Sequence, residues 1–240
     1  MSAKARARLA GVAYLVTVLT GLFAEIGVRG KLIDYDNAAA TAQNILGSES
    51  LYRWGLAADI VGGAAYVVVT VLLYELLKPV SRSLSLLAAA FSLVGIAIGG
   101  LAALGHLAPL LLLKDAYMAP FGTAQAQAMA LLALKLHARG YWISLVFFGF
   151  YELVLGYLIF KSRFFPRTLG VLVGLAGAAF LVNSFALFVS PPVGNALNVY
   201  MLALDGIGEI SLTLWLLIKG LDEAKWQACA LARNRLVSLA

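Results

Sequence analysis

Charge is scarce in this sequence. Of the 240 residues, 12% are Asp, Glu, Lys or Arg, whereas 62% are hydrophobic and the mean hydropathy is +0.91. Soluble domains carry about twice that share of charged residues, so water is not the main solvent of this chain. Because each membrane crossing needs roughly 20 apolar residues, six crossings with short connections leave no room for a separate soluble domain.

Cysteine and histidine are also rare. The single cysteine, Cys229, has no partner for a disulfide bond. A zinc site could draw on His106, Asp59 and Asp205, but these residues have no diagnostic spacing, and His137 falls in an expected outer segment. We therefore predict no metal and no cofactor. The GxSxG, HExxH, Walker and dinucleotide-binding patterns are missing too, so no motif dictates a reaction.

Six apolar segments are long enough to cross a membrane. They occupy residues 9–28, 51–77, 84–113, 141–160, 169–189 and 195–218. These segments predict an all-α fold, an integral membrane bundle of six transmembrane helices. We expect residues 1–240 to form a single polytopic domain that ends in a C-terminal tail at 219–240.

An even number of crossings puts both termini on the same side of the membrane. Of the 18 lysines and arginines, twelve fall on the side of the termini and six on the other side. The positive-inside rule then places both termini in the cytoplasm, for a multi-pass protein of the plasma membrane. The formal charge of +6 does not indicate nucleic-acid binding, because the cations lie between apolar segments and not on one basic face.

The N-terminus has the charges of a signal peptide, because Lys4, Arg6 and Arg8 precede an apolar stretch. That stretch starts at Leu9 and continues to Val28 without a small-x-small cleavage site, and five further spans follow it. We therefore expect it to be the first transmembrane helix and to stay attached.

The connections opposite the termini are long enough to hold short helices at the membrane surface. The first such helix should be capped by Asp36 and stop at Gly47. The second should span Thr123 to His137, where polar residues give way to apolar ones. We expect Pro191 and Pro192 in a loop, where the missing N–H costs nothing.

Pairs of glycines predict where the helices pack closely. Gly95 and Gly99 in the third span, and Gly170 and Gly174 in the fifth, are each four residues apart. In lipid, such small faces let helix backbones approach each other, so we interpret them as packing signals and not as ligand sites.

Four carboxylates lie at membrane depth: Asp59 in the second span, Glu152 in the fourth, and Asp205 with Glu209 in the sixth. A charged side chain near the centre of a membrane helix costs about 2.5–3.5 kcal/mol, so these acids should face the interior of the bundle. Asp205 and Glu209 are four residues apart and share a helix face, which Asn198 extends. We predict one shared interior cluster.

Matching cations are missing at that depth. His106 is the only basic group in the middle of a predicted span, and we expect Arg29 to pair with Glu25 in solvent at a helix end. The four acids must then hold protons, admit a cation, or borrow Arg53 and Arg139 from the outer surface. As an alternative, protonated carboxyl groups could bond across helices as purely structural links.

Several segments resemble a bacterial membrane-protein family catalogued as domain of unknown function 4386. The matching segments are Arg8-Leu9-Ala10-Gly11 through Phe23-Ala24-Glu25, Val28-Arg29-Gly30, Ala38-Ala39-Ala40-Thr41-Ala42, Asn44-Ile45-Leu46, Leu73 to Val80, Gly156 to Ser162, Phe165 to Gly170, and Gly208-Glu209 through Leu214 to Leu217. The resemblance covers nearly the whole chain. It implies an all-helical protein of the bacterial inner membrane, and it transfers no catalytic residue because the family has no settled activity.

Three functions remain open at this level. The first is a small carrier or permease in which Asp59, Glu152, Asp205 and Glu209, with Asn198 and His106, bind protons or a cation. The second is a structural, sensory or accessory membrane subunit with a protein partner on its outer face. The third is an intramembrane enzyme that acts on a lipid or quinone by proton transfer. The expected surroundings are the lipid bilayer, without nucleic acid.

Overall fold

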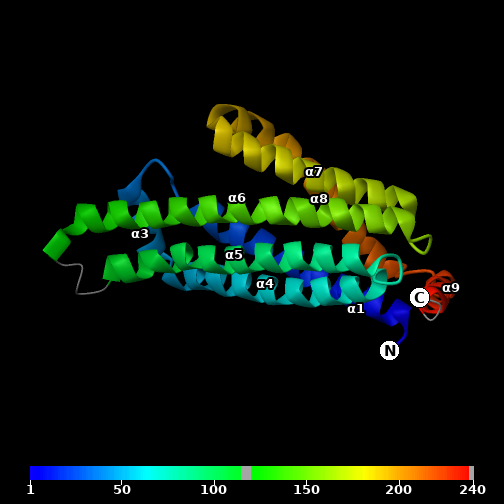
Figure 1. The fold of residues 1–240 in the computed structure, drawn as a ribbon. Coiled ribbons are helices and arrows are strands. Elements are labelled where there is room, and N and C mark those ends of the chain that lie inside the picture. Colours follow the sequence, from blue (N-terminus) through cyan, green and yellow to red (C-terminus); the bar gives the residue numbers. More distant parts are fainter. Residues whose placement is uncertain (115–119, 238–240) are drawn as a thin grey trace. The chain divides into compact units, whose positions relative to one another are not determined.

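The computed structural model describes the backbone of residues 1–114 and 120–237. Within these ranges the chain is helical and contains no strand, which confirms the all-α prediction (Figure 1). The helices, in chain order, are α1 (Ala3–Leu22), the π-helix η1 (Phe23–Arg29), α2 (Gly30–Leu32), α3 (Ala38–Gly47), α4 (Glu49–Leu77), α5 (Arg82–Lys114), α6 (Thr123–Lys161), α7 (Arg167–Val189), α8 (Pro191–Ile218) and α9 (Glu223–Val237).

In the described chain, six helical stretches are long and apolar enough to cross a membrane, as predicted. They are Ala3–Leu32, Glu49–Leu77, Arg82–Lys114, Thr123–Lys161, Arg167–Val189 and Pro191–Ile218. Large apolar side chains on these helices are exposed, such as Leu101 at 68% and Val199 at 72%. Water would disfavour such a surface and lipid would not, so the chain is a multi-pass membrane protein whose helices contact the bilayer.

The chain divides into two compact units that do not follow the order of the sequence. Unit 1 comprises Met1–Leu15, Tyr66–Gly95 and the described chain from Ile143 onward, and unit 2 comprises Val16–Ala65 and Ile96–Trp142. Helices α1, α4, α5 and α6 therefore contribute residues to both units. Each unit is held by contacts between residues that are distant in sequence.

Glycines hold the helices of unit 1 close together. Helices α7 and α8 lie side by side (Figure 1). Between α6 and α7, a Cβ added at Gly156 would lie 2.6 Å from the carbonyl oxygen of Gly170 and 2.6 Å from the backbone nitrogen of Gly174. No side chain fits at that distance, so the two backbones touch directly. The close approach expected at Gly170 is confirmed.

The two ends of the chain meet in unit 1, where α9 lies beside the start of α1 (Figure 1). The backbone N–H of Ala3 donates to Oε1 of Glu223 at 3.1 Å. Trp226 of α9 donates its indole N–H to the carbonyl of Leu76 at 2.8 Å, and the guanidinium of Arg6 lies over its ring. Most of the predicted tail at 219–240 is thus a helix that contacts the start of α1 and the end of α4.

In unit 2, α3 packs on a small apolar core. The buried side chains of that core are Val28, Leu32, Ile45, Tyr52, Leu110 and Leu134. The short outer helix was expected, but its cap is Asn37, whose side chain accepts from the backbone N–H of Ala40 at 3.0 Å. The expectation of Asp36 as the cap is wrong by one residue, because the N–H of Asp36 belongs to the preceding turn and binds Oδ1 of Asp34.

The second outer helix is not separate. Helix α6 runs unbroken from Thr123 to Lys161, so the expected end at His137 is wrong. Gly140 lies close to the expected end of the helix, and its missing Cβ permits a close contact, because a Cβ at Gly140 would lie 2.7 Å from that of Ala102. The favourable contact keeps the helix continuous.

Pro191 and Pro192 form the first turn of α8, where we had expected a loop. Proline is favourable at this position because the first N–H groups of a helix have no intrahelical partner and the ring presets a helical φ. The sixth span therefore starts four residues earlier than predicted, at Pro191 instead of Asn195.

Candidate functional site

Three of the predicted acids meet inside unit 1. Glu152 of α6 and Asp205 and Glu209 of α8 each place a carboxylate oxygen within 4.8 Å of the other two. We call these residues the acid triad. The i,i+4 spacing of Asp205 and Glu209 brings both onto one face of α8, as expected, and α6 adds the third carboxylate.

Tyrosines surround the acid triad. The hydroxyl of Tyr14 donates to Oε1 of Glu209 at 3.0 Å and lies 3.3 Å from the hydroxyl of Tyr66. The ring of Tyr66 in turn contacts that of Tyr151 edge to face, with 6.2 Å between centroids. Within the described residues no lysine or arginine forms an ion pair with the triad. The polar neighbours that the described contacts give the triad are therefore tyrosine hydroxyl groups.

Two oxygens of the triad lack hydrogen-bond partners. Glu152 is 1% exposed and Asp205 is 9% exposed, and Oε2 of Glu152 and Oδ1 of Asp205 are buried without a partner in the part of the chain that the structure describes. The hydroxyl of Tyr151 is in the same state. An unsatisfied buried carboxylate oxygen is costly, so this arrangement favours a bound proton or cation that supplies the missing interaction.

Asn198 does not bond to the triad. Its side-chain oxygen accepts from Nδ2 of Asn183 at 2.8 Å, which joins α8 to α7. Asn198 thus lies on the expected helix, and its described bond serves helix packing.

Asp59 lies in unit 2 and is not a member of the acid triad. Its carboxylate receives two bonds from Arg29, at 2.6 Å from Nη1 and 3.2 Å from Nη2. The same guanidinium donates from Nε to Glu25 at 2.7 Å, and Arg29 is only 8% exposed. Two expectations are therefore wrong. We had expected no matching cation for Asp59, but it pairs with Arg29. We had also expected Arg29 to pair with Glu25 in solvent, but Arg29 is buried.

The physical reason is the π-helix at the end of the first span. Residues Phe23–Arg29 form η1, whose wider turn changes the direction of the side chains that follow. Regular helical periodicity does not foresee this rotation. A sequence signal was nevertheless present, because Arg29 and Asp59 are opposite charges near the same ends of two adjacent spans.

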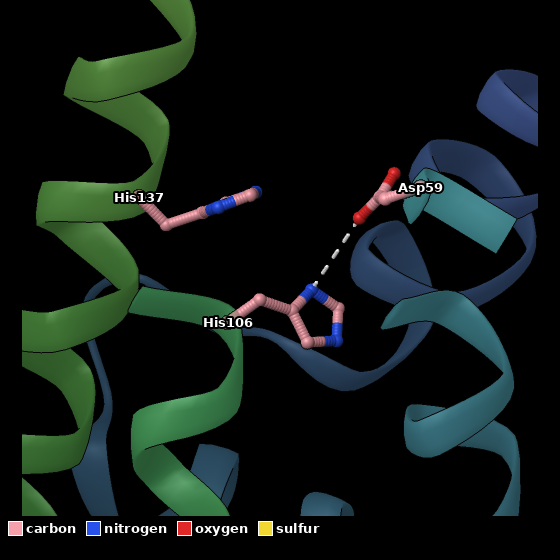
Figure 2. A group of neighbouring side chains, drawn as sticks. All are labelled: Asp59, His106 and His137. Carbon is pink, nitrogen blue, oxygen red and sulfur yellow. Dashed lines mark ion pairs between the residues drawn. The ribbon is translucent and has the colours of Figure 1, made fainter. Parts of the chain in front are cut away.

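The two histidines meet beside Asp59, as Figure 2 shows. His106 Nδ1 lies 3.8 Å from Oδ2 of Asp59, and the rings of His106 and His137 are 5.6 Å apart. His137 is 8% exposed and its Nδ1 lies 2.9 Å from the carbonyl oxygen of Ala102. The expectation that His137 lies apart in an outer segment is wrong, because α6 continues through it into the bundle.

Tyr52 fixes the position of His106. Its hydroxyl donates to the carbonyl of His106 at 2.5 Å, and Nε2 of His106 lies 3.2 Å from the carbonyl oxygen of Tyr52. If Nε2 carries the proton, it donates to that carbonyl, and Nδ1 is free to accept from Nη1 of Arg29 at 3.4 Å.

Asp59, His106 and His137 could offer three ligand atoms to a metal ion, since these atoms lie within 4.8 Å of one another. However, the guanidinium of Arg29 already contacts both Asp59 and His106. A positive group in this place competes with a metal cation for the same lone pairs. The arrangement favours a polar link between the first, second and third spans over a metal centre.

Comparison with known proteins places this chain in a family. The family described as "Domain of unknown function (DUF4386)" matches residues 9–220. The chain belongs to this family. A curated relative from Archaeoglobus fulgidus, described as an uncharacterized protein, is 30% identical over 155 residues, which are 64% of this chain and 76% of the relative. No solved structure matches the chain.

Membership of this family confirms the resemblance seen in the sequence. Neither the family nor the archaeal relative carries a described activity. The acid triad and the Arg29 network must therefore be judged on their own geometry and chemistry.

Proposed function

We propose that this protein is a small membrane carrier in which the acid triad binds protons or a cation. The observation that supports the proposal is the pair of buried oxygens, Oε2 of Glu152 and Oδ1 of Asp205, that have no partner among the described residues. A bound proton would let one carboxyl group donate to another, and a bound cation would be held by both.

The charge balance of the triad leads to the same conclusion. Each ionised acid near a helix centre costs about 2.5–3.5 kcal/mol in a membrane, and three neighbouring negative charges repel one another. Asp59 avoids this cost through Arg29, whereas Glu152, Asp205 and Glu209 have no such partner in the described chain. The compensating positive charge is therefore expected to come from solution.

The ligand chemistry narrows the cargo. Carboxylate oxygens and tyrosine hydroxyls are hard donors, which suit protons and hard cations and not soft transition metals. Tyr14 and Tyr66, whose hydroxyls are 3.3 Å apart, extend the polar contacts of Glu209 and could pass a proton onward. Intramembrane carboxylates of proton-driven carriers work through such relays.

The carrier would lie in the plasma membrane, and in a bacterium in the inner membrane, with both termini in the cytoplasm. This orientation is supported by the excess of lysine and arginine on the side of the termini.

A second function is favoured by the Arg29 network. The bonds of Arg29 to Asp59 and Glu25 support a role of an intramembrane acid as a link between helices. If the acid triad acts in the same way, through protonated carboxyl groups, the protein is an accessory or structural subunit. Helix α3 would then be a candidate surface for a protein partner.

Transport by purified protein in liposomes tests the carrier proposal. A panel of monovalent cations, divalent cations and cationic drugs is offered in both directions, with and without a pH gradient. We expect at least one of them to be transported by the wild type and not by the double variant Asp205→Asn, Glu209→Gln. The matched control is Asp34→Asn, Asp36→Asn, which removes two acids outside the spans and should transport normally. Transport of every panel member that is equal in wild type and in the triad variant would overturn the proposal.

A further inference from the structure

A basic hollow lies in unit 1, where the connection between α6 and α7 meets the segment that follows α8. Its volume is about 380 Å³. The lining residues are Arg163, Phe164, Phe165, Pro166, Trp215, Lys219, Gly220, Leu221, Asp222 and Lys225. We call it the basic hollow. The backbone N–H of Asp222 donates to the carbonyl of Phe164 at 3.2 Å, which ties the two segments together.

Two of its cations are uncompensated. Lys225 pairs with Asp222 at 2.9 Å, and this bond holds the pKa of Asp222 below its usual value, so that the carboxylate stays ionised and cancels the lysine. Arg163 and Lys219 have no ion-pair partner in the described chain. The basic hollow therefore has a surplus of two positive charges and suits an anion.

Arg163 lies in an unusual backbone turn. Arg163 adopts a positive φ of 60°, which is unusual for a residue with a side chain, and this fixes the turn that presents it. The aliphatic stems of Lys4 and Arg8 lie next to Gly220 of the hollow, because a Cβ added there would lie 3.1 Å from Cγ of Lys4 and 3.7 Å from Cγ of Arg8.

A second hollow adjoins the first and is apolar. It has a volume of about 340 Å³ and follows the groove between α7 and α8. Its lining residues are Pro166, Thr168, Leu169, Leu172, Ser211, Leu214, Trp215, Ile218 and Lys219. Pro166, Trp215 and Lys219 line both hollows, so the basic one continues directly into the apolar one. An inorganic anion would fill only the basic hollow.

Trp215, at the junction of the two hollows, carries an unused donor. Its indole N–H is buried and has no hydrogen-bond partner in the described part of the chain. A buried donor without a partner is costly, so an acceptor oxygen at this junction would be stabilising.

We propose that these adjoining hollows bind one anionic phospholipid. Arg163 and Lys219 bind its phosphate, Trp215 donates to a phosphate or ester oxygen, and an acyl chain lies in the groove between α7 and α8. The basic hollow lies at the end of the spans where the charge distribution predicts the cytoplasm, and the cytoplasmic leaflet is the one rich in anionic lipids. This site is independent of the acid triad and of the carrier function.

The test measures lipid binding to the purified full-length protein after removal of co-purified lipid, by native mass spectrometry and by thermal stabilisation in detergent. The probes are phosphatidylglycerol, phosphatidylcholine and inorganic phosphate. We expect phosphatidylglycerol to bind and stabilise more strongly than phosphatidylcholine, and phosphate alone to have no comparable effect. Equal effects of the two lipids would overturn the proposal. If phosphate alone reproduced the stabilisation, the site would be a simple anion site and the lipid proposal would be wrong.

The double variant Arg163→Asn, Lys219→Gln should lose the preference for phosphatidylglycerol, with binding about tenfold weaker or more. Asparagine is chosen because it tolerates the positive φ of residue 163. The matched control is Lys135→Gln, Arg139→Gln, which removes two exposed cations from unit 2 and should keep the preference. A preference that survives in the first variant, or that disappears in both, would contradict the proposal.

A third variant tests the proposal even if the double variant of Arg163 and Lys219 does not fold. Trp215→Phe keeps the net charge and an aromatic ring, and it removes the N–H donor. We expect weaker binding of both lipids, because both carry the phosphate and ester oxygens that Trp215 would bind, and an unchanged preference for phosphatidylglycerol. Wild-type binding of both lipids by this variant would count against a lipid at the junction.

Discussion

At the scale of single residues, the most consequential contact is the bidentate pair between Arg29 and Asp59. Arg29 is 8% exposed, and it is the only strong partner of Asp59 among the described residues. Removing one member of a buried pair leaves an uncompensated charge, whereas removing both is far milder. We therefore expect removal of Arg29 alone to lower the stability of the protein more than removal of both residues.

Arg29→Met should lower the free energy of unfolding by about 2–4 kcal/mol, a value reduced from that of fully buried pairs because Asp59 retains some access to solvent. The measurement is reversible unfolding in mixed micelles. Adding Asp59→Asn should recover part of the loss, which a double-mutant cycle quantifies. Arg53→Met is the control: its pair with Glu49 is exposed, and we expect a loss below about 1 kcal/mol. An equally small loss for Arg29→Met would show that the buried pair is not stabilising.

The acid triad gives the opposite expectation. If it binds protons or a cation, Glu152→Gln with Asp205→Asn should leave stability at neutral pH unchanged or raise it, because two buried acids become neutral, each of which has one oxygen without a described hydrogen-bond partner. If the acids are structural links, the same change should cost about 0.6–2 kcal/mol for each lost bond. The same unfolding experiment distinguishes the two outcomes, with Asp36→Asn as the control.

Sequence alone could predict part of this site. The spacing of Asp205 and Glu209 correctly predicted that they share one helix face. The cost of a charge in lipid correctly predicted that Glu152 faces the interior of the bundle, where it lies close to them. The sequence could not predict that Asp59 pairs with Arg29, because this contact depends on the direction in which the side chain of Arg29 leaves the first span. The π-helix that sets this direction has no signature in the pattern of apolar residues.

At the scale of helices, the structure depends on glycines whose missing side chains let backbones touch. The contact between α6 and α7 at Gly156 is one example, with 2.6 Å between a built Cβ and two backbone atoms of α7. Backbone cannot move aside as a side chain can, so the helices would have to separate.

Gly156→Ala should therefore destabilise the protein by about 1–3 kcal/mol, despite the better helix propensity of alanine. Gly174→Ala is the matched control, because a Cβ there meets no atom within 4 Å. That variant should be neutral or slightly more stable. Thermal unfolding of the two variants side by side measures the difference, and equal stability would mean that α6 and α7 are not packed through Gly156.

The existence of the helices was easier to predict than their ends. The order of apolar residues in the sequence is enough to predict six stretches of sufficient length, and all six are helical. The continuity of α6 and the start of α8 at Pro191 were not foreseen. In both places a residue that usually interrupts helices, Gly140 or a proline, is tolerated for a local reason: a close contact with Ala102 or a position in the first turn.

At the scale of the whole molecule, the chain is a multi-pass membrane protein, and the excess of cations on one side predicts its orientation. A green fluorescent protein fused to the C-terminus should fluoresce in bacterial cells, and alkaline phosphatase fused there should be inactive. The reverse result is expected for fusions after Lys114, the last residue of α5, which ends on the predicted outer side. An active phosphatase at the C-terminus would invert the topology.

We propose that the acid triad exchanges a proton or cation with solution. Infrared difference spectroscopy of the purified protein in lipid measures this directly, since carboxyl groups change their absorption when they release or bind a proton or a cation. For the wild type we predict reversible carboxyl signals on changing pH or adding the transported cation, and we predict their loss in the variant Glu152→Gln, Asp205→Asn, Glu209→Gln. Identical difference spectra for the two proteins would contradict the account.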